Sequence, residues 1–287
     1  MPLPISYSML AEGGDHDDVT HGTSIKFGDI EYSTVKGTEP DSKRLDIITS
    51  SANAYKTEQS STSSVEDEDT ISSIGSLGSF LGTVPNANAL LNYYLELGGD
   101  ATHYRDLDVQ SLITNSTVAN SSWLESINNI LRASEYLAVE GKTVNIDQTT
   151  ETQVQLSKST GLWNKNRDWY LAFIDGFYYT DTDVDNLTVT VAEDGTRTYS
   201  ATIVYTVIDY YSFYDYRNSE DTSSFLLWGP TRKELAQLHL DGNALDFLIE
   251  SQLTYTVEWT DGERVGQDEL YDRTTESVNE SILTVVE

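Results

Sequence analysis

The residues best suited to chemistry gather in one acidic and aromatic stretch, IDYYSFYDY at residues 208–216. Asp209 and Asp215 supply two carboxylates at the end of a predicted strand. His239 stands near the C-terminal end of a predicted helix, where the helix dipole favours its protonated form. If that helix packs beside the strand, His239 could meet Asp209 or Asp215 as a general acid–base pair. The alternative is a histidine that only packs and caps at the helix end.

A second group of acids lies in DTDVDN, where Asp181, Asp183 and Asp185 alternate. An EF-hand calcium loop would need Gly at its sixth position and Glu at its twelfth, where this chain has asparagine and alanine. The stretch therefore predicts a solvated loop entering a strand, with an irregular cation site as the alternative.

Other metal or cofactor chemistry has little support. The chain contains 4 His and no Cys, and the two His of HDDVTH, residues 16–21, would need further ligands to form a zinc site. No G-x-S-x-G elbow is present. We therefore expect no resident metal.

The charge of the chain is strongly negative, with 17 Lys and Arg against 47 Asp and Glu and a net charge of −30. Such a surface repels phosphate backbones, so we expect no nucleic-acid partner. Two interpretations remain open: a surface adapted to high salt, where screening relieves self-repulsion, or a merely acidic protein.

The sequence predicts neither a standard signal peptide nor a membrane-spanning helix. Its N-terminus lacks a basic region followed by an apolar run, and no stretch of 18 apolar residues predicts a membrane-spanning helix. We expect no signal peptide, and a location outside the cell by a non-classical route or within a particle.

Composition divides the chain into four parts. Residues 1–74 form an acidic arm rich in Ser and Thr, and residues 75–84 a linker rich in Gly and Ser. The arm alone would bury too little apolar surface to order itself, so residues 1–84 predict contact with a protein partner or a neighbouring subunit. Residues 85–141 read as a small helical unit, with a helix capped by Asn86 and another opened by a capping box at Ser122.

Residues 142–287 read as a β-rich domain because the apolar period changes to two. Residues 187–191 and 199–207 alternate as two long strands around a turn at EDGT. GPTRKELAQLHLDG predicts a helix, NALDFLIE a second short helix, and TYTVEWTDGERVG a closing hairpin. The expected fold is α+β, an antiparallel sheet with a helical pair packed on it.

Three segments carry a family resemblance: RDWYLAFIDGFYY, the D-x-Y of residues 209–211, and LHLDGNALDF. In this order they resemble a block in the C-terminal regions of bacterial polymorphic-toxin-like proteins, over about residues 85–260. One departure is Leu240, which stands where those proteins usually carry a cationic residue after the histidine. The residues that match by position are Trp169, Tyr170, Gly176, Asp209, Tyr211, His239, Gly242, Ala244 and Phe247.

The resemblance implies a toxin-type effector domain delivered to a target cell, with an immunity-like protein as its partner. Asp209, Asp215 and His239 are then the expected catalytic residues. Tyr211, Trp169 and Tyr170 are the expected binding residues. The alternative is a structural or adhesive assembly protein, a component of a virion or surface appendage from a salty habitat. The acidic surface and the Thr- and Tyr-rich strands favour it.

Overall fold

Three long strands form the centre of the molecule. The computed structural model describes residues 23–35, 82–96, 103–156, 165–174, 176–220, 225 and 230–265. Strands β6 (Phe177–Val191) and β7 (Arg197–Tyr211) form a hairpin, and Gly195 takes a φ of +87° in its turn. Strand β8 (Phe247–Thr260) pairs with β7 from Thr198↔Thr260 to Tyr211↔Phe247. The alternating Val, Thr and Tyr residues thus form the predicted strands.

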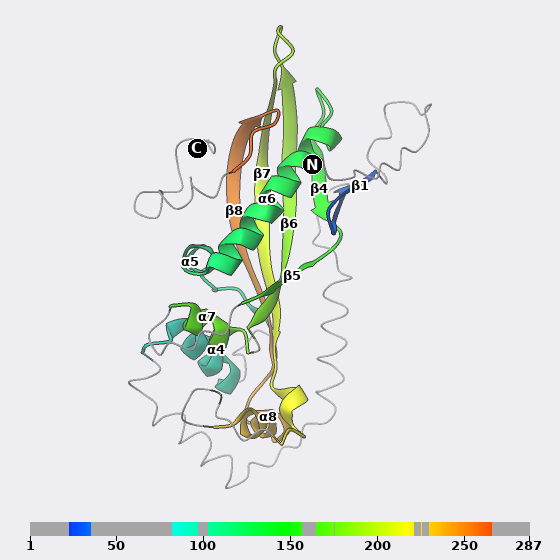
Figure 1. Ribbon diagram of the computed structural model, residues 1–287. Helices are drawn as coiled ribbons and strands as arrows, with labels where there is room; N and C mark the ends of the chain where they lie inside the picture. Colours follow the sequence, from blue (N-terminus) through cyan, green and yellow to red (C-terminus); the bar gives the residue numbers. More distant parts are fainter. Residues whose placement is uncertain are drawn as a thin grey trace.

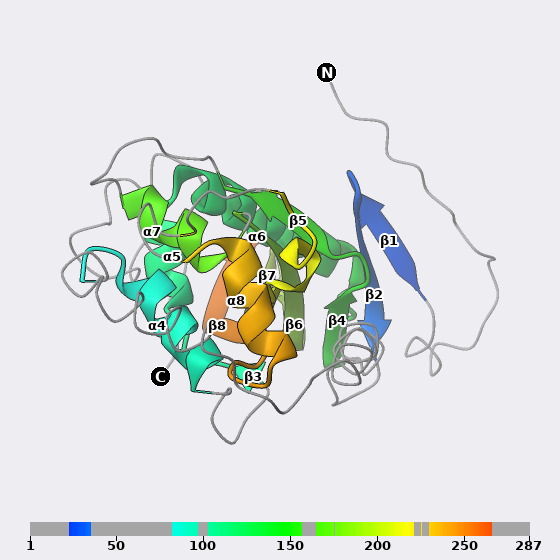
Figure 2. The ribbon, with the colours of Figure 1, turned by 90° about the horizontal axis from the view of Figure 1, so that it is seen from below.

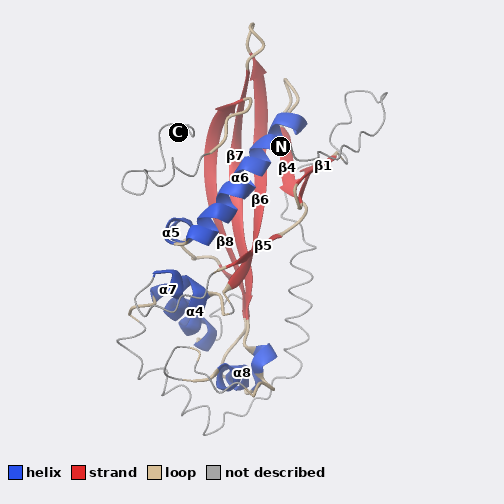
Figure 3. Ribbon diagram, in the orientation of Figure 1, coloured by secondary structure: helices blue, strands red, loops and turns tan. Residues whose placement is uncertain are grey.

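Shorter strands extend the sheet on both sides, in the order β1-β2-β4-β6-β7-β8-β3 (Figures 1 and 3). Strand β4 (Val144–Gln148) and strand β5 (Thr152–Gln155) both pair with β6, and β3 (His103–Tyr104) runs parallel to β8. All other pairings are antiparallel. The predicted α+β class is confirmed.

Part of the acidic arm belongs to the sheet. Strands β1 (Ser24–Phe27) and β2 (Ile30–Val35) form a hairpin, and β2 pairs with β4. This part of the arm therefore orders against its own chain. The remaining arm residues, 1–22 and 36–74, the predicted linker up to residue 81 and the HDDVTH motif lie outside the described residues.

Helix α6 (Thr117–Leu137) covers one face of the sheet and crosses it obliquely (Figures 1 and 2). Ser116 caps it by accepting a hydrogen bond from Ala119 N, so the helix begins before the predicted capping box. Trp123 of this helix packs against Tyr255 on β8, and their ring centroids lie 6.2 Å apart. The short helix α5 (Val109–Asn115) precedes it and was not predicted. None of the helices in the described residues is long and apolar enough to cross a membrane.

Helices α4 (Pro85–Leu95) and α7 (Lys165–Ala172) pack together, and a side chain of α7 caps the N-terminus of α4. The predicted cap, Asn86, does not cap α4 from within, because Val84 occupies the N-cap position without a side-chain hydrogen bond. The buried carboxylate of Asp168 on α7 instead accepts hydrogen bonds from Asn86 N, Asn86 Nδ2 and Ala87 N. A negative charge at a helix N-terminus also complements the helix dipole.

Helix α8 (Arg232–Leu240) is the predicted helix, and Thr231 and Glu234 form its capping box. The predicted second helix, NALDFLIE, is wrong. Its Phe247–Glu250 portion begins β8. Residues 254–260 of the predicted closing hairpin continue β8 and the predicted turn follows at Asp261 and Gly262, but residues 263–265 form no return strand. A 3₁₀ turn, η1 (Tyr214–Tyr216), accompanies α8 at this end of the sheet in place of the expected helix (Figure 1).

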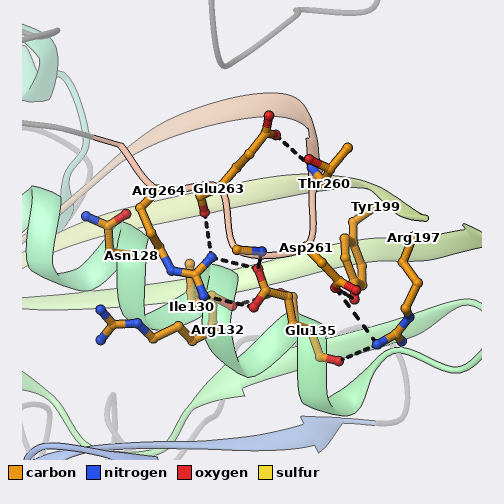
Figure 4. Close-up of polar contacts among 12 residues, drawn as sticks. Asn128, Ile130, Arg132, Glu135, Arg197, Tyr199, Thr260, Asp261, Glu263 and Arg264 are labelled. Carbon is orange, nitrogen blue, oxygen red and sulfur yellow. Dashed lines mark hydrogen bonds and ion pairs between the residues drawn. The ribbon is translucent and has the colours of Figure 1, made fainter. Parts of the chain in front are cut away.

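Polar contacts hold the C-terminal end of α6 against the end of the sheet that lies away from α8 (Figure 4). Arg264 donates to both carboxylate oxygens of Glu135 at 2.6 and 2.8 Å. Arg197 donates to the main-chain oxygens of Glu135 and Ala138, which are among the last carbonyls of the helix. Asn128 exchanges two hydrogen bonds of 2.9 Å with the main chain of Val265. Arginine thus holds the negative end of the helix dipole.

Candidate functional site

Aromatic rings form the floor of the candidate site, where β7 and β8 reach the end of the sheet. Tyr211 stacks on Phe247 with ring centroids 4.8 Å apart and an interplanar angle of 15°. The edges of Phe213 and Tyr94 also pack here, since both lie in the same ring cluster. All four rings are buried. The cluster fixes the ends of β7 and β8 against α4.

His239 and Asp246 form a buried couple beside this cluster. The Nδ1 atom of His239 lies 3.3 Å from Oδ1 of Asp246, and the two side chains are 2% and 1% exposed. The main-chain N–H of Asp246 also donates to Nδ1, so the proton of the neutral imidazole is on Nε2. Between the two residues the chain reverses at Gly242, whose φ is +79°.

Ser212 connects this couple to the surface. Its hydroxyl donates to Oδ2 of Asp246 at 2.6 Å, and its oxygen accepts a hydrogen bond from Tyr214 N at 3.1 Å. Ser212 is partly exposed, whereas Asp246 and His239 are buried. The hydroxyl of Ser212, the carboxyl of Asp246 and the imidazole of His239 therefore follow one another from a partly exposed residue to two buried ones.

Burial shifts the pKa values of Asp246 and His239 in opposite directions. It raises the pKa of Asp246 to about 7, with a smaller contribution from the charge of Asp215 and an opposing one from the Ser212 hydrogen bond. Burial also lowers the pKa of His239 to about 4. Both groups are thus neutral between these values, and a proton on Oδ1 of Asp246 would lie between that atom and Nδ1 of His239. Groups with divergent pKa values are frequent at catalytic sites.

The predicted catalytic residues have different positions. His239 lies in the couple, and Asp215, in η1 and exposed, is close enough to influence Asp246. Asp209 lies on β7 opposite Ile249, and its charge adds to the effect of burial, which raises the pKa of Tyr211. The carboxyl group beside His239 is that of Asp246, which sequence reasoning did not single out.

The predicted binding residues are mostly structural. Tyr211 is fully buried, and Trp169 stacks against Phe173 in the core. Tyr170 is half-buried and packs against Gly176. Ser212, which is partly exposed, and Asp215, which is exposed, supply the accessible polar groups of the candidate site.

A cluster of acids lies on β4 and β6; Asp181 and Asp183 are within β6 and not in the predicted loop. Carboxylate oxygens of Asp147, Asp181 and Asp183 lie within 4.8 Å of one another, close enough to hold a cation. Two of the three predicted cation ligands are therefore present, and Asp147 from β4 takes the place of Asp185. Asp185 is exposed beside a β-bulge, where Asn186 has a φ of +57°.

Comparisons of the chain with models of protein families, with curated proteins and with solved structures find no match.

Proposed function

We propose that the protein is a toxin-type effector and that Ser212 is its nucleophile. Asp246 takes the Oγ proton of Ser212 on Oδ2 while the new oxygen–carbon bond forms at an ester or amide carbonyl of the target, whose π electrons move onto its oxygen. The tetrahedral intermediate then breaks its bond to the alcohol or amine, which leaves with the proton from Oδ2, and water releases the acyl group from Ser212 in the same way. His239 positions Asp246 and does not touch the substrate. The single observation that carries the proposal is the line from Ser212 through Asp246 to His239.

The raised pKa of Asp246 supports this assignment. A carboxylate with an ordinary pKa near 4 is a weak base towards a serine hydroxyl. With a pKa of about 7, Asp246 is a stronger base, and it is about half ionised at neutral pH and mostly ionised above it. The 2.6 Å hydrogen bond already directs the Ser212 proton towards it. Activity should therefore rise as the pH passes through about 7.

The positions of the family-like residues also support the proposal. Tyr211 and Phe247 stack beneath the site, and Ala244 and His239 are buried around the chain reversal. The resemblance thus concerns residues that build the floor of this site. The two residues proposed to react, Ser212 and Asp246, are not part of the shared pattern.

Expression of the full chain inside a salt-tolerant bacterium tests the proposal. We expect induction of the wild type to stop growth and Ser212→Ala to restore it at equal soluble yield and equal melting temperature. Ser200→Ala, a matched change on the exposed face of β7, should remain toxic. Normal growth with the wild type, or full toxicity of Ser212→Ala, would refute the assignment.

An immunity-like protein is the partner that this function requires. It would cover the partly exposed Ser212 and Asp215, so co-expression should restore growth without lowering the amount of effector. The acidic arm and the linker, residues 1–84, are proposed to dock on a delivery protein. Loss of delivery without loss of intracellular toxicity on removal of residues 1–22, which keeps the β1–β2 hairpin, would separate the two roles.

We also propose that Asp147, Asp181 and Asp183 bind a hard cation such as Ca²⁺, because oxygen ligands gathered at this spacing suit such ions. Isothermal titration of the full chain should show one site that Asp183→Asn removes. Asp185→Asn is the matched control and should retain it. Equal binding by both variants would place the cation elsewhere.

A further inference from the structure

Strand β8 lies at one side of the three long strands and forms an edge of the sheet over most of its length (Figure 1). Strand β3 covers only the part of this edge next to Leu248 and Ile249. In the described part of the chain, no strand pairs with the outer edge of β8 beyond these two residues. An open edge presents unpaired N–H and C=O groups to any extended segment that approaches it.

The register shows which main-chain groups of β8 point outwards. Asp261 N donates to Arg197 O at 3.3 Å, and the ladder between β7 and β8 continues from there without a shift. In an antiparallel pair, residues that bond to the neighbouring strand alternate with residues whose main-chain groups point away from it. Since Asp261 bonds to β7, the residues that point away are Gln252, Thr254, Thr256, Glu258 and Thr260.

Thr260 agrees with this assignment and marks one end of the open edge. Its N–H donates to the Glu263 carboxylate at 2.7 Å, and its carbonyl oxygen accepts from Glu263 N at 3.1 Å (Figure 4). The main-chain N–H and C=O groups of the other four residues make no hydrogen bond with the described part of the chain. The open edge therefore runs over residues 252–258.

The two faces of this edge differ in polarity. Tyr255 points towards α6, so Leu253 and Val257 face the same side, and all three side chains are buried or half-buried. The four residues with unpaired main-chain groups carry polar side chains on the opposite face, where they are exposed or half-exposed. A strand added at this edge would therefore alternate apolar residues on the α6 side with polar residues on the other side.

The charge at this edge favours a basic partner. Glu258 is exposed and forms no ion pair with the described residues. At one end of the edge Arg105 is paired with Glu250. At the other end Arg264 is paired with Glu135. A second copy of the chain, with its charge of −30, would be repelled here, whereas a segment rich in Lys or Arg would be attracted.

We propose that the outer edge of β8, residues 252–258, binds an extended basic segment of a partner protein as an additional strand. Main-chain hydrogen bonds to the four unpaired residues provide affinity, and the side chains on the two faces provide specificity. Apolar residues of the segment cover Leu253 and Tyr255, and a Lys or Arg residue pairs with Glu258 across the strands. This contact is separate from Ser212, so it does not depend on the proposed activity.

Binding of synthetic peptides to the full chain tests the proposal. The probe peptide alternates valine with lysine, and the control peptide has proline in place of each valine. The control keeps the charge but cannot form a strand, because proline lacks the N–H donor. By fluorescence anisotropy we expect the probe to bind at least tenfold more tightly than the control. Equal binding of the two peptides would show attraction by charge alone and would overturn the proposal, as would no binding at millimolar probe.

Thr256→Pro separates the edge from the rest of the acidic surface. The N–H of Thr256 points away from β7, so proline removes an outward donor without removing a hydrogen bond between β7 and β8. This change should raise the dissociation constant of the probe at least tenfold, whereas Thr256→Ala, which keeps the N–H, should change it less than twofold. Glu258→Gln should raise it several-fold in dilute buffer and less in high salt. Wild-type affinity in Thr256→Pro would refute the edge as the binding site.

Amide hydrogen exchange of the wild type covers the case in which Thr256→Pro does not fold. In the free protein the N–H groups of Thr254 and Thr256 should exchange rapidly, and those of Tyr255 and Val257, which face β7, slowly. Saturating probe peptide should slow exchange at Thr254 and Thr256 at least tenfold. The N–H of Lys26, which likewise points away from its neighbour β2, is the control and should not be slowed. Binding of the probe without slower exchange at Thr254 and Thr256 would place it elsewhere and contradict the proposal.

Discussion

Nδ1 of His239 lies 3.3 Å from Oδ1 of Asp246, and together they join the end of α8 to the start of β8. Both groups are buried, and three further ionisable groups lie around them. Burial raises the pKa of Asp246 and that of Tyr94; Asp215 adds to the shift of Asp246, and Asp246 and Tyr211 add to the shift of Tyr94. Protonation of this couple therefore affects how α4, α8, β7 and η1 are held together.

Asp246→Asn should alter the pH dependence of stability. The pKa of Asp246 is raised from 3.8 to about 7, so its stabilising contribution is complete below 3.8 and is lost as the pH rises to about 7. The free energy of unfolding of the wild type minus that of the variant should fall over this range, by on the order of 4 kcal/mol. Urea unfolding at a series of pH values measures it. Asp29→Asn, in the exposed turn of the β1–β2 hairpin, is the matched control, and equal pH profiles for the two variants would contradict the raised pKa of Asp246.

His239→Gln should change the pH dependence of stability in the opposite sense to Asp246→Asn. Burial lowers the pKa of His239 from 6.5 to about 4, so its contribution is complete above 6.5 and is lost as the pH falls to about 4. Relative to the variant, the wild type should therefore lose stability on acidification through this range. Unfolding monitored by tryptophan fluorescence measures the loss. A difference that grows towards acid pH would contradict the lowered pKa.

Two substitutions of Tyr211 distinguish the contribution of its ring packing to stability from that of its hydroxyl group. Its hydroxyl is buried and has no hydrogen-bond partner among the described residues, while its ring stacks on Phe247. Tyr211→Phe should therefore leave the free energy of unfolding unchanged or slightly raised. Tyr211→Ala should lower it by about 3–5 kcal/mol through the lost ring contacts. Chemical denaturation distinguishes them, and a large loss for Tyr211→Phe would show that the hydroxyl is bonded.

Gly176→Ala should destabilise the chain more than Gly195→Ala. Both glycines have positive φ, at +72° and +87°, so each substitution carries a backbone cost of about 1–2 kcal/mol. A Cβ at position 176 would also overlap ring atoms of Tyr170, whereas one at position 195 meets nothing. The difference in melting temperature between the variants isolates the overlap. It should shrink in a Tyr170→Ala background, and a difference that persists there would exclude Tyr170 as the cause.

Glu135→Gln should weaken the attachment of α6 in a salt-dependent manner. Glu135 forms a two-point contact with Arg264, and the side chains are 15% and 27% exposed. A double-mutant cycle with Arg264→Met should give a coupling of about 1 kcal/mol in dilute buffer and less in high salt. The pair Arg105–Glu250, with Arg105 69% exposed, is the control and should give a smaller value. Equal couplings would mean that the geometry of the first pair contributes nothing.

The sequence predicted elements whose signals are local. The β6–β7 hairpin follows from alternation around Gly195, and α8 from Pro230 near its start, its apolar spacing and Gly242 as its stop. The start of β8 was missed because Leu245, Leu248 and Ile249 also fit a helical period. Pairing with β7 over residues 247–260 outweighs that short pattern.

The site was harder to predict because its members come from separate elements. His239 was identified by its type and place on a helix, but Asp246 stands between a helix and a strand and belongs to no pattern. Its position beside His239 depends on the chain reversal at Gly242. Asp168 was missed as the cap of α4 for the same reason, since the two lie about eighty residues apart.

The pairing of β2 with β4 has a consequence for the order of folding. Val35 pairs with Asn145, whereas the β6–β7 hairpin closes over one short turn. Closing a long loop costs more chain entropy than closing a short one, so the central strands should form before the β1–β2 hairpin joins the edge. In native-state hydrogen exchange, the amides of β7 should therefore be protected longest. Those of β2 should be released first, through partial openings that leave the rest of the sheet intact.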